Sequence, residues 1–165
     1  MSDIENLTER AIALKDLLAS QQTLLLSTVS SKGVPDLSYA PFVKDQAGCF
    51  YILVSELAEH TANLLAQPQA SVMFIRPETE SRNLFARERV IFNCIATEVQ
   101  STDPLYRFQL NALETKFGEV VGLLRSLADF HLFALSPQSG RYIVGFGQAF
   151  TCDVKNGTVI PYLHH

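Results

Sequence analysis

Strand-like segments joined by short turns make up most of this chain, and this pattern constrains its fold more than any other feature. The first two segments, residues 23–30 and 34–43, are separated only by Ser31-Lys32-Gly33, whose composition is typical of a hairpin turn. Helices are predicted at only a few places, first over residues 5–19, where apolar residues recur at helical spacing. A parallel α/β fold would instead alternate strands with helices. The pattern predicts a mainly β (α+β) protein, an antiparallel barrel with peripheral helices.

Turn and cap signals position the remaining elements. Ser55 is a candidate cap for a helix over residues 56–66, and Asp103-Pro104 indicates the start of a helix that closes at Gly118.

Nearer the C-terminus, a turn is expected at residues 137–140, between strands over 130–135 and 141–146. Asn156-Gly157 predicts a further hairpin that leads into a last strand.

Two segments indicate where the sheet needs cover and where it ends. Residues 88–99 read as a strand with apolar residues on both faces. One face can line the barrel, and the other needs a helix or a second subunit, so dimerisation is expected. Pro35 and Pro41 lack the N–H groups that ladders use, which predicts an edge or a bulge in residues 34–43.

Length and composition bound the class of protein. A chain of 165 residues with 47% apolar residues can bury a core as one domain, with a helix at about residues 5–19 and a barrel at about 23–163. The net charge of −4 argues against a nucleic-acid partner. No stretch approaches the ~20 apolar residues that a membrane span needs. The three scattered cysteines favour buried free thiols, so we expect a cytoplasmic protein without a membrane partner.

Hydroxyl groups interrupt the apolar positions of residues 23–43. They belong to Ser27, Thr28, Ser30, Ser38 and Tyr39. A strand serving only a core would carry Val, Ile or Leu there, so the hydroxyls face either solvent or a polar ligand. The segment alone does not decide between the two.

An arginine cluster in RNLFARERV is the first candidate site. Arg87 and Arg89 project to one face of an extended chain and Glu88 to the other. Two adjacent guanidinium groups, with Arg82 nearby, suit a phosphate or carboxylate. A solvated strand end, balanced by Glu80 and Glu88, is the alternative.

Histidines supply the other candidates. His60 falls on the same predicted helix side as Glu56 and Asn63, either as a surface histidine or as a ligand contact near the helix start. Asp129 and His131 alternate on one strand face. A carboxylate beside an imidazole can fix its tautomer, although such residues are often mere neighbours.

The terminal His164 and His165 could ligate a metal or haem iron, or could be the remnant of a purification tag.

A complete dinucleotide-binding motif is absent. Gly145-Phe146-Gly147 opens like a dinucleotide fingerprint, but Phe150 stands where a third glycine is required.

Four segments together resemble one superfamily. They are LSTVSSKGVPDLSYAPFV, FYILVSELAEHTANLLAQPQASVMFI, NLFARERVIFNCIATEV and GRYIVGFGQAF, within about residues 23–150. They are similar to the FMN-binding split-barrel superfamily that includes pyridoxamine 5′-phosphate oxidase, and most similar to its haem-utilisation proteins of the HutZ/HugZ type. The resemblance implies a homodimer of six-stranded antiparallel split β-barrels, with cofactor sites at the subunit interface.

The resemblance also implies roles for individual residues. In flavin-binding relatives the segments at 37–43, 55–60 and 87–89 surround FMN, but His60 replaces a phosphate-contacting lysine and Arg89 a flavin-contacting glutamine. In haem-degrading relatives an aspartate at the position of Asp129 supports a C-terminal ligand histidine, for which His164 or His165 would substitute. The implied cofactor-binding set is Thr23, Ser38, Tyr39, Ser55, His60, Arg87 and Arg89.

Three functions stay open. The first is haem binding, extended to oxidative degradation of haem in a cleft between subunits. The second is an FMN-binding oxidoreductase of the pyridoxamine-phosphate-oxidase type. The third is a non-catalytic haem or flavin carrier. The sequence decides neither between haem and FMN nor between enzyme and carrier.

Overall fold

The structure is a computed structural model that describes residues 3–154 and 158–161. The predicted Asn156-Gly157 turn and the terminal His164 and His165 lie outside the described residues.

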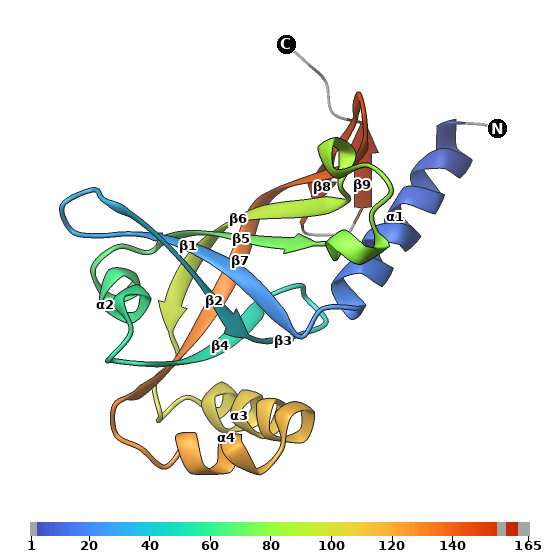
Figure 1. The fold of residues 1–165 in the computed structure, drawn as a ribbon. Coiled ribbons are helices and arrows are strands. Elements are labelled where there is room, and N and C mark those ends of the chain that lie inside the picture. The colour runs from blue at the N-terminus through green and yellow to red at the C-terminus, as the bar shows by residue number, and fades with distance from the viewer. Residues whose placement is uncertain (1–2, 155–157, 162–165) are drawn as a thin grey trace.

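One curled antiparallel sheet, shaped as a half-barrel, forms the body of the molecule (Figure 1). Its strand order is β2-β1-β5-β6-β7-β4-β3, and β8 and β9 extend it from β7. The strands are β1 (Thr23–Val29), β2 (Pro35–Pro41), β3 (Val43–Lys44), β4 (Phe50–Ser55), β5 (Gln69–Ile75), β6 (Arg89–Glu98), β7 (Phe130–Gly145), β8 (Gln148–Asp153) and β9 (Thr158–Pro161). The two prolines of β2 therefore lie on an edge strand, as predicted.

Helices cover parts of this sheet. They are α1 (Asp3–Ala19), α2 (Glu59–Ala66), α3 (Pro104–Phe117) and α4 (Glu119–Leu124), with 3-10 turns at Glu78–Glu80 and Leu84–Ala86. Figure 1 shows α3 and α4 together at one end of the sheet, with α1 along a side. The predicted signals of α3 are confirmed: the Asp103 side chain accepts from the Leu105 N–H, and Gly118 ends the helix at φ 86°.

Alternation along the strands separates two apolar clusters. The larger one fills the inside of the curl around the rings of Phe42, Phe50, Phe74 and Phe92, which meet in edge-to-face and tilted contacts. The smaller one lies beneath α3 and α4. On β6 every second residue faces the large core, so the apolar residues between them face outward, away from it.

The expected turn at residues 137–140 is wrong. β7 runs unbroken through it and carries a bulge, where Cys94 lies opposite Pro137 and the preceding Asn93 opposite Ser139. Pro137 is tolerated at the bulge because a ladder hydrogen bond is interrupted there. Gly140 reflects close packing, since a Cβ there would lie 2.8 Å from the Phe92 ring.

The expected start of α2 is also wrong. The helix begins at Glu59 after Ala58, without a side-chain cap, so Ser55 does not cap it. The Ser55 hydroxyl instead accepts from the Leu57 N–H at 3.1 Å, inside the turn that precedes the helix. The serine stabilises the approach to α2 and leaves its own O–H proton free to be donated elsewhere.

Candidate functional site

His60, on the first turn of α2, contacts the edge strand β2. Its Nδ1 lies 2.9 Å from the Ser38 hydroxyl oxygen, which joins two residues that the sequence had singled out separately. Burial lowers the pKa of His60, and the nearby Asp36 carboxylate only partly offsets this. The imidazole is therefore held in its neutral form at neutral pH, in which one ring nitrogen keeps a lone pair.

A buried hydrogen bond fixes α2 against β1. The Asn63 side-chain amide donates to the Thr28 hydroxyl at 3.0 Å, and both residues are buried. The Thr28 hydroxyl thus faces neither solvent nor a ligand, a third outcome that the sequence analysis did not consider. Asn63 and His60 share a helix side, as predicted, since both contact inward-facing residues of the β1–β2 hairpin, whereas Glu56 precedes the helix.

A second pair of polar residues joins the end of β4 to the start of β7. The Ser55 hydroxyl donates to Asp129 Oδ2 at 3.0 Å, and the Glu56 N–H donates to the Asp129 carbonyl at 2.8 Å. The Thr61 hydroxyl in turn donates to the Ser55 carbonyl at 2.5 Å. Since Thr61 follows His60 directly, the His60–Ser38 and Ser55–Asp129 contacts are linked through the first turn of α2.

His131 is not the partner of Asp129 that the sequence suggested. Its Nδ1 lies 2.5 Å from Glu98 Oε1, and its Nε2 lies 2.7 Å from Glu56 Oε1. Hydrogen bonds to Glu98, and next to Glu56, raise the pKa of His131. Because each nitrogen must donate to its carboxylate, this contact pattern holds the ring as imidazolium. Glu98 was overlooked because it lies at the far end of β6, remote in sequence.

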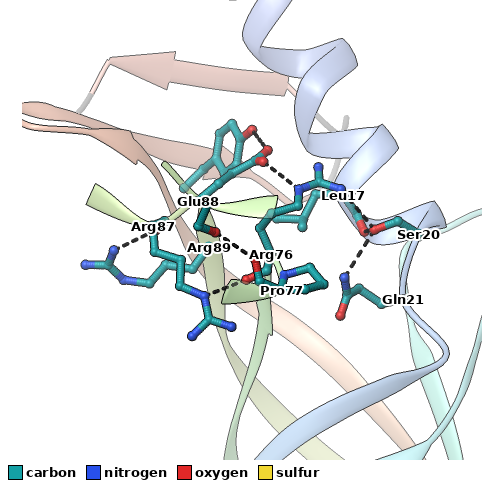
Figure 2. A network of polar contacts seen from close by, with 10 residues as sticks. Leu17, Ser20, Gln21, Arg76, Pro77, Arg87, Glu88 and Arg89 are labelled. Atoms are coloured by element: carbon teal, nitrogen blue, oxygen red, sulfur yellow. Dashed lines mark hydrogen bonds and ion pairs between the residues drawn. The ribbon is translucent and has the colours of Figure 1, made fainter. Parts of the chain in front are cut away.

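The arginine cluster lies at the start of β6. Figure 2 shows Arg87 and Arg89 extending from one side of the strand and Glu88 turned the other way, as predicted. Glu88 accepts from Arg76 Nε at 3.0 Å and from the buried Tyr142 hydroxyl at 2.5 Å. Burial and this carboxylate both raise the pKa of Tyr142. Glu88 therefore forms its contacts on the opposite side of the strand and does not neutralise Arg87 and Arg89.

Backbone contacts hold the two guanidinium groups in place. Arg87 Nε donates to the Arg76 carbonyl at 2.5 Å, and an Arg89 Nη donates to the Arg87 carbonyl at 2.8 Å. One Nη of Arg87 also lies 3.7 Å from the exposed carboxylate of Glu78. A guanidinium has five N–H donors, so donors are left with which Arg87 and Arg89 can bind an anion.

The predicted residues divide between the two faces of the sheet. Ser38 lies opposite Leu26 and faces inward toward His60, whereas Tyr39 lies opposite Leu25 and faces outward. Arg89 is on this outward face too, because it pairs with Ile75, two residues beyond the Leu25 partner Met73. Thr23 shares that face by the same alternation along β1.

Apolar side chains surround the outward group, and the sequence analysis missed them. Leu37 is 74% exposed and Tyr39 64% exposed on β2, next to Leu25. Met73 and Ile91 continue this row across β5 and β6. The signal was available in the alternation of β2, whose outward positions 37 and 39 are both apolar or aromatic.

The class of protein is identified by comparing the sequence with those of known families. The sequence model of the pyridoxamine 5′-phosphate oxidase family matches residues 11–144, and the chain belongs to this family.

Among individual proteins, the chain is similar to HutZ and ChuZ. Over 92% of its length the chain is 38% identical to the heme oxygenase HutZ of Vibrio cholerae, of which it covers 84%. A crystal structure of HutZ, described there as a heme storage protein, superposes with a TM-score of 0.76 over 82% of this chain and 96% of that one. ChuZ of Campylobacter jejuni, at 28% identity, gives 0.80 over 96% of this chain and 66% of ChuZ. None of the helices in the described part of the chain is long and apolar enough to cross a membrane.

Proposed function

We propose that this protein binds haem for haem utilisation and degrades it oxidatively in a cleft between two subunits. The observation that carries the proposal is the half-buried His60, held by Ser38 with its pKa lowered. By the resemblance drawn above, flavin-binding relatives have a phosphate-contacting lysine there. A neutral imidazole serves an FMN phosphate less well, because it adds no positive charge. The relative from Vibrio cholerae, named a heme oxygenase, supports the same choice.

The donors of the site fit the charges of haem. Arg87 and Arg89 would bind its propionates with their remaining N–H groups. Iron, when bound, supplies the activation of O₂. Asp129 would orient a proton donor or a ligand imidazole through its carboxylate, for which it would exchange its bond to Ser55. His164 or His165 would bind the iron, and Thr23, Tyr39 and Ser55 would make further contacts along the cleft.

The cleft requires a second copy of the chain. We infer a homodimer of six-stranded split barrels in which the outward apolar row of Leu25, Leu37 and Tyr39 packs against its partner. An exposed row of this kind on an antiparallel sheet is typical of an interface. Light scattering should give twice the 18.3 kDa chain mass, and Tyr39→Glu should shift the protein toward monomer. We place the dimer in the cytoplasm, where thiols stay reduced.

Hemin titration followed by absorbance tests the function directly. The wild-type protein should develop a Soret band, and Arg89→Ala should weaken hemin binding about tenfold or more, the typical effect of one charged hydrogen bond. Arg107→Ala, which removes an exposed arginine on α3, is the matched control and should bind hemin normally. A protein that takes up no hemin contradicts the proposal. Equal affinity of Arg89→Ala and wild type would remove Arg89 from the site.

Two other functions are distinguished by the same preparation. The family match itself favours an FMN-dependent oxidoreductase as the second candidate. In that case the protein should be yellow and release FMN on denaturation. A carrier would bind hemin without consuming it when a reductant and O₂ are supplied, whereas a degrading enzyme would lose its Soret band.

A further inference from the structure

A hollow lies between α1 and the sheet, and none of the proposed cofactor residues lines it. This cavity of about 350 Å³ falls within the ~300–1,000 Å³ range of small-molecule pockets. Most of its wall is apolar, and the buried rings of Phe50 and Phe92 contribute to it. The helix side is formed by Ala11, Ile12, Leu14 and Leu18.

One end of the cavity is basic. Lys15 and Lys44 line both this cavity and an adjoining hollow of about 360 Å³, to which α3 adds Lys116. Three lysines, from α1, β3 and α3, therefore line two adjoining hollows that share Lys15, Leu18 and Lys44, which together are called the α1 groove. Among the described lining residues, Asp153 is the acidic one, and it lines only the apolar cavity.

Lys116 is held in position without a carboxylate. Its Nζ donates to the Phe42 carbonyl at 2.7 Å and lies 4.2 Å from the centre of the Phe42 ring. The ion pairs found among the described residues include none of the three lysines. Burial lowers the pKa of Lys116, as expected for an ammonium group that lacks an anionic partner.

An apolar cavity that adjoins lysines with no carboxylate partner among the described residues matches one kind of ligand. We propose that the groove binds a medium-chain fatty acid, with its chain against Phe50 and Phe92 and its carboxylate at Lys116, Lys44 and Lys15. An uncharged chain would fill the cavity but leave the ammonium groups unpaired. An inorganic anion would contact the lysines but leave the cavity without an apolar occupant. Only an amphipathic anion satisfies both parts of the groove.

Calorimetric titration of the full chain with decanoate, below its micellar concentration, tests this site. Decanoate should bind, and decanol should bind about tenfold more weakly or worse, because it lacks the charge. Lys116→Met should weaken decanoate binding to a similar extent, whereas Lys32→Met, in the β1–β2 turn, should not. Ala11→Phe, which fills the cavity from α1, should abolish decanoate binding. Circular dichroism checks that each variant is folded.

Several outcomes would overturn the proposal. They are the absence of decanoate binding to the wild type, equal affinities for decanoate and decanol, and unchanged binding by Lys116→Met. A hemin titration repeated with saturating decanoate separates this site from the haem site. Unchanged hemin affinity supports two sites, and competition between the two ligands would overturn the assignment to the α1 groove.

Discussion

The bond between Thr28 and Asn63 should govern both stability and the position of His60. Thr28→Val preserves the shape of the side chain but leaves the Asn63 amide N–H groups without their partner. At 4% and 6% exposure of the two residues, water cannot replace the lost bond. An unsatisfied buried amide costs about 1–3 kcal/mol of unfolding free energy. For a domain of this size, that corresponds to a fall in Tm of roughly 2–4 °C per kcal/mol.

A double-mutant cycle isolates the bond from the change in packing. Asn63→Leu should also destabilise the protein, whereas Thr28→Val with Asn63→Leu should be less destabilised than the sum of the two, because no polar group is then left unpaired. Thermal melts by circular dichroism, supported by urea unfolding, give the coupling free energy. Strictly additive effects, or a Thr28→Val protein within about 0.5 kcal/mol of wild type, would refute this reasoning.

Thr28→Val should also change the pKa of His60. Burial lowers the pKa of His60, so a loosened α2 should let water reach the ring and raise that pKa toward its ordinary value near 6.5. An NMR titration of the His60 ring protons measures this directly. Unchanged titration in Thr28→Val would mean that α2 keeps its place by apolar packing alone.

Three further changes should act in predictable directions. Gly140→Ala should cost about 1–3 kcal/mol of stability by overpacking, since its Cβ would lie 2.8 Å from the Phe92 ring. Urea unfolding measures this cost. Gly145→Ala on the same strand is the matched control, because the nearest contact of its Cβ would be at 3.5 Å. His131 has its pKa raised above the unfolded value of 6.5, so its stabilising contribution is complete below that pH and is lost as the pH rises through the raised pKa. The stability difference between wild type and His131→Gln should therefore shrink on going from mildly acid to alkaline pH, and a constant difference argues against the imidazolium. Asp103→Ala should cost about 1 kcal/mol by removing the cap of α3, whereas an unchanged melting curve would mean that the cap adds nothing.

Local chemistry made much of the fold predictable from sequence. The Asp103 cap, the Gly118 stop and the proline-bearing edge strand are each specified by a few adjacent residues. Gly140 was misread because glycine serves turns and close packing alike, and only the position of Phe92 across the sheet distinguishes them. In the candidate site, too, local signals identified single residues but not the contacts between them. His60 and Ser38 could be named separately, but their contact depends on how α2 docks, which no local signal specifies.

The two carboxylates on His131 restrict the possible coordination chemistry of the chain. An imidazole whose two nitrogens both donate protons has no lone pair to offer a metal ion. Of the four histidines in the sequence, three are thus left as candidates to bind the iron. If His60 and the terminal pair are each replaced by alanine, the spectrum of the ferric complex should identify the iron ligand with no contribution from His131.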